Sequence, residues 1–465
     1  MASLSSWYHR GFSQLTSRPP TTVSAERPAP ESGLAENFDL RQVLLHGRRL
    51  DFRERVGSFA GWYRQRREQG AVLHNRVVTS PVDRAVTVFD PETRAEREML
   101  MFGSNSYLGF TNHPYVRQRA AEAVAEYGAG VGGVPLLSGY SRLHAELEER
   151  LSAFKGKEAT VIFQSGYGAN LGLLSALVGK GGLALYDALS HASTIDGLAM
   201  AAGASRSFRH NDAADLDRLL EAHEGGDVFV CTEGVYSMDG DLGALDEIVP
   251  VAQRHGAVVV VDDAHGTGVT GRNGRGTADH FGVTSGVDAI MGTFSKAFGV
   301  TGAAVSTSRD LADYLRYFAR SYVFSSSIPP SSAASVLAGL DLLERDPSVT
   351  RRLQENTRYL AGRLRALGFP ATEETAVFAL LAPEGMDLRR AGLFVHRAGI
   401  FGHTIEYPAV PTKKQRFRFS VMATHTRDDL DRLVAVIEET WARFAGGVPC
   451  GATSEGRAEA GAEAG

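Results

Sequence analysis

Between residues 159 and 306, short apolar runs alternate with longer segments of helical pattern. Six runs consist almost entirely of apolar residues: 159–163, 182–186, 227–231, 257–262, 288–292 and 302–306. A strand that is apolar on both faces must be buried on both faces, as when helices cover both sides of a mainly parallel sheet. The pattern therefore predicts an α/β fold. Ligands of such sheets bind beyond the carboxyl ends of the strands, so residues that follow each run are the first site candidates.

The segments outside this region have other patterns. A helical pattern and a hairpin around Asp90 precede it, and a long helical stretch after Pro330 leads into alternating helices and strands. The ends of the chain are rich in Ser, Pro, Gly or Ala. We predict a disordered extension, an N-terminal arm, a large domain, a smaller C-terminal α+β domain and a disordered tail, at 1–37, 38–110, 111–335, 336–445 and 446–465.

Composition excludes several classes of function. A net charge of −5 argues against nucleic acid or an anionic membrane as partner. Two cysteines provide neither a disulfide framework nor the ligands of a metal site, and no apolar run is long enough to span a bilayer. We expect a cytoplasmic protein that acts on small molecules. The absence of acidic residues before Glu26 keeps the mitochondrial matrix as an alternative.

Lys296 is the only charged residue between Asp288 and Arg309, although the chain has only six lysines. The other five, beside glycine, charged or loop residues, are Lys155, Lys157, Lys180, Lys413 and Lys414. Burying an unpaired ammonium is costly, and arginine cannot replace a primary amine in Schiff-base chemistry. We therefore interpret Lys296 as a pyridoxal phosphate (PLP) lysine; the alternative is a lysine at a strand end with its amine in water.

Polar residues follow the run at 257–262. Asp262 and His265 are three residues apart at the end of this predicted strand, where both can reach one ligand. A carboxylate facing a pyridine nitrogen would keep it protonated, and His265 could donate to the ring hydroxyl. A metal pair or an ordinary turn remains the alternative.

Other strand ends add candidates for a cofactor site. Ser165, Gly166 and Tyr167 form a turn before an apolar helix, where free backbone N–H groups and the helix dipole suit a phosphate. His191 could stack on a cofactor ring or lie on the surface. Polar groups that follow two further runs are Glu233, Ser237 and Thr293, the last offering a hydroxyl to the phosphate.

Two further motifs need opposite interpretations. Arg416 and Arg418 alternate on a predicted strand and so share one face, where a guanidinium can bind a carboxylate bidentately or form a surface ion pair. The glycine-rich stretch 128–133 matches G-x-G-x-x-G but follows a helical segment rather than a strand, which argues against dinucleotide binding. We interpret it as a flexible loop near the substrate.

Taken in order, these motifs resemble the α-oxoamine synthases among the fold-type I PLP enzymes. The similar strings include SNSYLGF, GYSRLHAELE, FQSGYGAN, DALSHAS, RHND, TEGVYSMDGD, VDDAHGTGVTGRNGRG, GTFSKAFGVTGAA, FSSSIPP and RFRFSVMATHT, between Phe102 and His425. The resemblance implies a fold-type I transferase with a large PLP-binding domain. It also implies PLP-dependent decarboxylative condensation of glycine, alanine or serine with an acyl thioester, on coenzyme A or a carrier protein, to an α-amino ketone.

The resemblance also implies roles for individual residues. Lys296 would bind PLP and act as base, Asp262 would face the pyridinium, His265 the ring hydroxyl, and His191 would stack on the ring; these four form the expected catalytic set. The remaining expected cofactor contacts are Ser165, Gly166, Tyr167, Glu233, Ser237, Thr293, Ser295, Ser325 and Ser326. The last two would reach the phosphate of a neighbouring subunit, which implies a homodimer with a shared site. Asn105 and Arg418 would bind the amino-acid carboxylate.

One departure bears on the acyl donor. Many members of the family have Ser-Arg or Thr-Arg where this chain has Val134-Pro135. If that arginine seats a carboxylated acyl chain, its absence favours a fatty or polyketide acyl donor over succinyl or pimeloyl. Two rival hypotheses are another fold-type I enzyme (an aminotransferase or decarboxylase) and a non-catalytic partner subunit. The first usually has tyrosine at His265 and an NPxNPTG loop, and the second would be expected to lose Lys296.

Overall fold

A computed structural model describes residues 51–68, 72–90, 93–407 and 409–449. Contacts divide the chain into two units, Met1–Val72 and Leu73–Gly465, and each is described by itself. The first unit has one described helix, α3 (Phe52–Glu68), within the predicted helical segment. The predicted extension at 1–37 and most of the tail lie outside the described residues. The unit boundary falls inside the predicted arm 38–110, and the five-part division stays a prediction.

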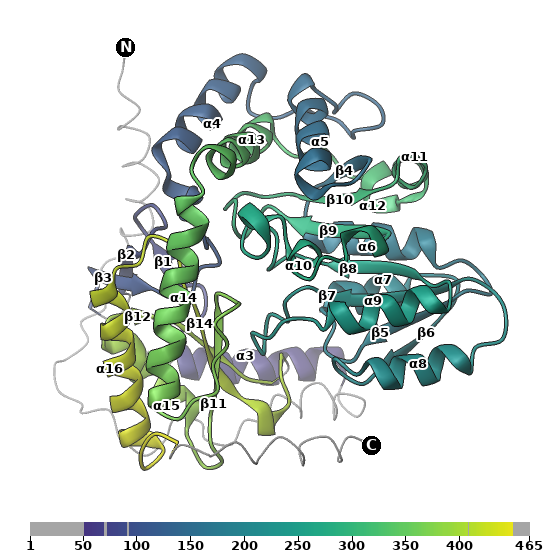
Figure 1. Cartoon of the computed structure of the whole chain (residues 1–465). Coiled ribbons are helices and arrows are strands. Elements are labelled where there is room, and N and C mark those ends of the chain that lie inside the picture. Colours follow the sequence, from purple (N-terminus) through teal and green to yellow (C-terminus); the bar gives the residue numbers. More distant parts are fainter. Residues whose placement is uncertain (1–50, 69–71, 91–92, 408, 450–465) are drawn as a thin grey trace. The chain divides into compact units, whose positions relative to one another are not determined.

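The second unit is built on a seven-stranded sheet in the order β4-β10-β9-β8-β7-β5-β6 (Figure 1). All strands run parallel except β10, which is antiparallel to both of its neighbours. The strands are β4 (Ala159–Phe163), β5 (Leu183–Asp187), β6 (Ala204–Phe208), β7 (Val228–Glu233), β8 (Val258–Asp262), β9 (Ala289–Thr293) and β10 (Ala303–Thr307). The mainly parallel sheet and all six predicted strands are confirmed.

The strand that the apolar pattern missed is β6, at the edge of the sheet. Its first four residues are exposed and only Phe208 is buried, because an edge strand has little of its surface covered. The sequence ASRSF therefore carries no apolar run, although its backbone pairs with β5 along its whole length.

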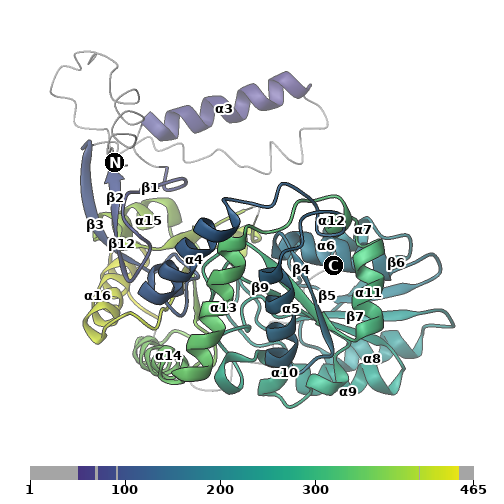
Figure 2. The same cartoon turned by 90° about the horizontal axis from the view of Figure 1, so that it is seen from above.

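Helices cover both faces of this sheet, as Figure 2 shows. Successive β8 residues alternate between two apolar clusters: Val260 belongs to the cluster with α6, whereas Val259 and Val261 belong to the cluster with α8 and α9. The large-domain helices of eight residues or more are α4 (Pro114–Tyr127), α5 (Arg142–Lys155), α6 (Gly166–Leu177), α7 (Ala192–Ala199), α8 (Ala213–Glu221), α9 (Leu245–Arg254) and α11 (Arg309–Phe318).

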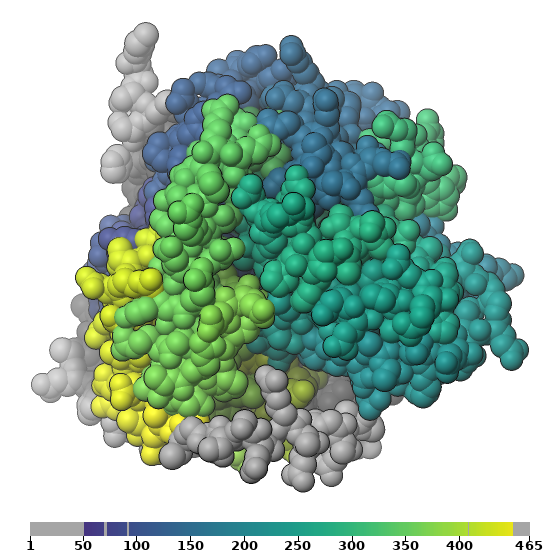
Figure 3. Space-filling view, viewed as in Figure 1, coloured from purple at the N-terminus to yellow at the C-terminus, as the bar shows by residue number. Residues whose placement is uncertain are grey.

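Two smaller sheets are formed by segments before and after the large sheet. The hairpin of β2 and β3 joins β1 and β12 in one of them, and β11, β14 and β13 form an antiparallel second sheet. Helices α14 and α16 contact each other and appear in Figure 3 in green and yellow. The elements are β1 (Val77–Val78), β2 (Ala85–Asp90), β3 (Ala95–Met101), α13 (Pro330–Arg345), α14 (Ser348–Ala366), β11 (Val377–Leu381), α15 (Leu388–Arg397), β12 (Ile400–Phe401), β13 (His403–Ile405), β14 (Arg416–Ser420) and α16 (Arg427–Phe444).

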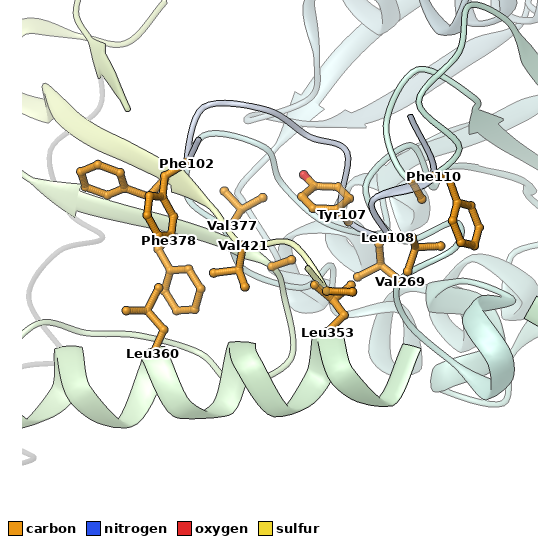
Figure 4. Close-up of a cluster of buried hydrophobic side chains, with 14 of the residues drawn as sticks. Phe102, Tyr107, Leu108, Phe110, Val269, Leu353, Leu360, Val377, Phe378 and Val421 are labelled. Carbon is orange, nitrogen blue, oxygen red and sulfur yellow. The ribbon is translucent and has the colours of Figure 1, made fainter. Parts of the chain in front are cut away.

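One apolar cluster holds the segment 102–110 in place between these elements. Phe102, Tyr107 and Phe110 are each at most 1% exposed and pack with side chains of α14 and β11 (Figure 4). Burying an aromatic ring of this size contributes roughly 2–3 kcal/mol. The polar residues between these anchors are thereby held rigidly. No described helix is long and apolar enough to span a bilayer.

A buried ion pair lies beneath the loop that follows β8. Lys155, at the end of α5, donates to Asp263 Oδ2 at 2.8 Å, to Thr267 Oγ1 at 2.7 Å and to the Arg275 carbonyl at 2.8 Å. Its side chain is 3% exposed and that of Asp263 is 1% exposed. Lys155, which the sequence shows only as a lysine beside Gly156, is thus buried at the end of a helix. The pair fixes the loop directly beside Asp262.

We expect Lys155→Met to destabilise the protein by about 3–5 kcal/mol, because it leaves the Asp263 carboxylate buried without its cation. Urea unfolding measures the loss. Lys157→Met is the matched control, since the Lys157 amine donates to two backbone carbonyls and to no carboxylate. Adding Asp263→Asn should recover part of the loss. Equal losses for Lys155→Met and Lys157→Met would contradict this account.

A second ion pair joins two loops at the carboxyl edge of the sheet. His210 Nδ1 lies 3.0 Å from Asp187 Oδ1 and its Nε2 lies 2.8 Å from Asp241 Oδ2. Burial alone would lower the pKa of His210, but its hydrogen bonds to both carboxylates outweigh burial and raise the pKa to about 10. The imidazolium thus ties the end of β5 to the loop after β7.

The pH dependence of stability follows from this shift. Because the folded pKa of His210 lies above its ordinary value near 6.5, its contribution is complete below about pH 6.5 and is lost as pH rises towards about 10. We expect the wild-type chain to exceed His210→Gln in urea midpoint by a margin that shrinks across this window. A margin that stays constant from about pH 6 to about pH 10 would refute the assignment.

Candidate active site

Strand register brings the predicted strand-end residues together. In the parallel ladder Glu233 at the end of β7 pairs with Asp262 at the end of β8, which in turn pairs with Met291 of β9. Thr293 ends β9. Because neighbouring parallel strands end at the same edge, residues far apart in sequence line one site.

Asp262 is a buried carboxylate that is hydrogen-bonded but lacks a cation. It is 7% exposed; its Oδ2 accepts from Asn170 Nδ2 at 2.7 Å and its Oδ1 accepts from the Ala264 N–H at 3.0 Å. No Lys, Arg or His of the described ranges lies in salt-bridge distance of it. A buried carboxylate usually has a cationic partner, so this one suits a cationic ligand group such as a protonated ring nitrogen.

His191 is held by residues on both sides of it. Its backbone N–H donates to Glu233 Oε1 at 2.5 Å, and its Nδ1 lies 2.8 Å from Ser193 Oγ. Asn170 Nδ2 in turn donates to Ser193 Oγ at 2.9 Å, which links His191 to Asp262 through two side chains. Burial of the ring nitrogens lowers the pKa of His191, so the imidazole is predominantly neutral near pH 7. A neutral ring can lie over a cationic cofactor without repulsion.

Glu233 is a buried carboxyl group that accepts the backbone N–H of His191. It is 4% exposed, and burial followed by the neighbouring Asp262 raises its pKa well above the ordinary value. The raised pKa favours the protonated form of Glu233, and Oε1 accepts the His191 N–H. The structure thus shows a role in positioning His191; the expected direct contact with the cofactor stays a prediction.

The amine of Lys296 follows β9 and is free of partners among the described residues. Burial lowers its pKa to about 8, against the opposing effects of Asp262 and Glu233 and with a smaller contribution from Arg418. A lysine with this pKa is neutral, and hence nucleophilic, far more often than an ordinary one. The residue as a whole is partly exposed, and the interpretation of Lys296 as a PLP lysine stays a prediction.

The start of α6 forms an anion-binding cradle. Ser165 caps the helix by accepting the Gly168 N–H at 3.0 Å, and the N–H groups of Gly166 and Tyr167 bond to no described residue. A Cβ at Gly166 would lie 3.3 Å from Thr293 Oγ1, so only glycine leaves this approach open. The hydroxyls of Thr293 and Ser295 are 2.9 Å apart beside it. Free backbone amides at a helix N-terminus, with hydroxyls beside them, suit a phosphate, although the Thr293 hydroxyl also donates to the Gly302 carbonyl at 3.1 Å.

A second anion site lies on β14. Arg418 Nε donates to the Ser237 carbonyl at 2.7 Å and its Nη2 donates to Asn105 Oδ1 at 3.2 Å, and no carboxylate of the described residues pairs with it. Arg416, on the same face, is already paired with Asp239 at 2.7 Å. Of the two predicted arginines only Arg418 can receive a carboxylate, and the structure brings it to the predicted Asn105.

Tyr107 and Asn170 are site residues that the sequence analysis missed. Tyr107 OH lies 2.7 Å from His265 Nδ1, and burial, followed by Lys296 and Arg418, lowers the pKa of His265 well below its ordinary value. Both residues stand inside strings already recognised, SNSYLGF and FQSGYGAN. Their signal was a polar group between apolar anchors, which points to packing as much as to chemistry.

The remaining predicted contacts lie in the segment before α13. Gln164 Nε2 donates to the Ser325 carbonyl at 3.1 Å, which places this segment beside the start of α6. Ser326 is exposed. Contact of Ser325 and Ser326 with a phosphate in a neighbouring subunit stays a prediction. In the part of the chain that the structure describes, no three His, Cys, Asp or Glu side chains could hold a metal ion together.

These residues fit PLP. The cradle at Gly166 and Thr293 suits its phosphate, the cation-free carboxylate of Asp262 suits its ring nitrogen, and the partner-free amine of Lys296 suits its aldehyde. PLP thus carries one suitable group for each of these three parts of the site.

Comparisons with known proteins agree with this geometry. The family described as aminotransferase class I and II matches residues 97–437. A serine palmitoyltransferase of Bacteriovorax stolpii is 40% identical over 346 residues, which cover 74% of this chain and 82% of that protein. An 8-amino-7-oxononanoate synthase of Geobacter sulfurreducens is 40% identical over 384 residues, covering 82% and 97%.

Solved structures give the same answer. A serine palmitoyltransferase from S. paucimobilis, with PLP bound, has a TM-score of 0.79 at 30% identity and covers 84% of this chain and 99% of its own. These similarities confirm the fold-type I architecture and the PLP dependence. The chain belongs to the aminotransferase class I and II family, and within it to the PLP-dependent α-oxoamine synthases.

Proposed function

We propose that this α-oxoamine synthase joins glycine, alanine or serine to a fatty or polyketide acyl thioester. The observation that carries the proposal is the cation-free Asp262 beside a partner-free amine of pKa about 8. In the reaction of this family the amino-acid Cα loses a proton and forms a bond to the acyl carbonyl carbon. The thiol leaves, the carboxyl group departs as carbon dioxide, and Cα takes up a proton in its place to give an α-amino ketone.

Different residues of the chain have separate roles in this proposed reaction. PLP, when bound, supplies the aldehyde and a ring that accepts the electron pair left on Cα. Asp262 would keep the ring nitrogen protonated, and the Lys296 amine would accept the Cα proton. Neutral His191 covers the ring face and excludes water. Arg418 and Asn105 hold the carboxylate until it leaves.

The glycine loop supports an uncharged acyl chain. The segment 128–139 contains no charged residue, and Leu137 is 84% exposed while Leu136 is 37% exposed. The Ser327 N–H donates to the Gly133 carbonyl at 3.1 Å, which ties the loop to the segment that contacts the start of α6. An apolar chain can cover these leucines, whereas a second carboxylate would find no cation on this loop. Coenzyme A and a carrier protein both remain as the thiol.

We also propose a homodimer with a shared site, acting in the cytoplasm. Exposed aromatic rings support the interface: Tyr317 is 70% exposed, Phe318 59% and Phe324 70%. An apolar surface of this kind usually marks an interaction site, and Phe324 directly precedes Ser325. The buried free thiol of Cys231 supports a reducing compartment.

We expect the purified protein with PLP to be yellow and its absorbance to shift with one of the three amino acids, with carbon dioxide released only after a thioester is added. Borohydride should fix PLP to wild type and to Lys180→Ala, an exposed lysine variant, but not to Lys296→Ala. Equal fixation in Lys296→Ala would refute the lysine assignment. A protein that stays colourless would favour the non-catalytic partner subunit, and amino transfer without thioester would favour an aminotransferase.

The acyl donor is tested with two coenzyme A thioesters of equal chain length, heptanoyl and pimeloyl. We expect wild type to favour heptanoyl in kcat/KM, because nothing on the glycine loop offsets the desolvation of the terminal carboxylate. Pro135→Arg should move the ratio towards pimeloyl by about tenfold, and Pro135→Gln, uncharged and of similar length, should not. A wild-type preference for pimeloyl would overturn the assignment of an uncharged donor.

A further inference from the structure

We propose that Tyr107 is a positioning residue whose hydroxyl donates to Nδ1 of His265, keeps the histidine's proton on Nε2, and ties it to the carboxylate-binding pair Asn105 and Arg418. The inference rests on the proposed function only for the identity of that carboxylate. The hydrogen bonds themselves belong to the chain.

The geometry places one hydroxyl between two acceptors. Tyr107 OH lies 2.7 Å from His265 Nδ1 and 3.3 Å from Asn105 Oδ1. Tyr107 is 1% exposed and His265 is 6% exposed, so the contact between them is shielded from water. Figure 4 shows the Tyr107 ring among buried apolar side chains, with its oxygen on the side away from the helix that carries Leu353 and Leu360. The ring is thus anchored by packing and its hydroxyl is held in one place.

The number of protons then decides the direction of each bond. Burial raises the pKa of Tyr107 to about 12, so the phenol keeps its single proton near neutral pH. Burial keeps His265 neutral, with one N–H. The phenol proton goes to the nearer acceptor, Nδ1, because a hydroxyl contact of 2.7 Å is of ordinary length and one of 3.3 Å is long. The His265 proton therefore lies on Nε2, where it can be donated to the cofactor.

The second acceptor links this histidine to the substrate. Asn105 Oδ1 also accepts from Arg418 Nη2 at 3.2 Å and from Ser420 Oγ at 3.2 Å. A carboxylate bound at Arg418 would compete for the guanidinium N–H that donates to Asn105 Oδ1. That amide oxygen would then lose one of its hydrogen-bond donors. The Tyr107 hydroxyl, 3.3 Å from Asn105 Oδ1, is a remaining donor that also contacts His265. Occupancy of the carboxylate site therefore changes how firmly the His265 proton is held on Nε2.

The test is the ¹⁵N NMR spectrum of the full-length protein with PLP bound and its histidines labelled, with His265→Gln assigning the signal. We expect an unprotonated Nδ1 and a protonated Nε2 in wild type. In Tyr107→Phe the two tautomers should mix, and kcat should fall about tenfold, which is what one lost hydrogen bond is commonly worth. Tyr322→Phe, a buried tyrosine with no contact to a site histidine, should leave the His265 signal unchanged.

Three outcomes would overturn the proposal. The first is a proton on Nδ1 in wild type, which needs no variant and so holds even if Tyr107→Phe fails to fold. The second is a Tyr107→Phe signal identical to wild type. The third is a His265 signal in wild type that does not respond when the selected amino acid binds. The tautomer is read without turnover, so absence of condensation would refute the proposed function and leave this test intact.

Discussion

The buried negative charge of Asp262 is the constraint on which the rest of the site depends. A carboxylate at 7% exposure with two hydrogen-bond donors and no described cation is stable only if its surroundings favour charge. Asn170 supplies one of these donors and also donates to Ser193 Oγ, which contacts His191 Nδ1. The sheet supplies the position, since β8 lies between β7 and β9 and ends where both of them end.

The ionisable groups around that charge are adjusted to one another. Burial, followed by the neighbouring Asp262, raises the pKa of Glu233, and burial lowers the pKa of Lys296. The imidazoles of His191 and His265 remain neutral for the same reason. The site therefore combines the carboxylate of Asp262 and the guanidinium of Arg418 with groups whose pKa values are shifted towards the neutral form.

Much of the fold and of the site could be predicted from residue patterns. The six apolar runs predicted six strands because a strand covered on both faces has no polar side, and Asp262, Thr293 and His191 were found because parallel strands end together. Strand β6 escaped because its side chains are exposed. The burial of Lys155 could not be predicted, because sequence does not show whether a helix end is buried; its amine lies 2.8 Å from Asp263 Oδ2.

The sequence by itself determined most of the local elements and the family, and it predicted Lys296 and Asp262 as site residues, since each depends on a short pattern of residue types. Only the tertiary structure decided which of Arg416 and Arg418 is available, because the first is paired with Asp239 from another loop. It also assigned Tyr107 to His265, across 158 positions of sequence. A hydrogen bond or an ion pair needs atoms within about 3 Å, and for residues distant in the chain only the packed fold sets that distance.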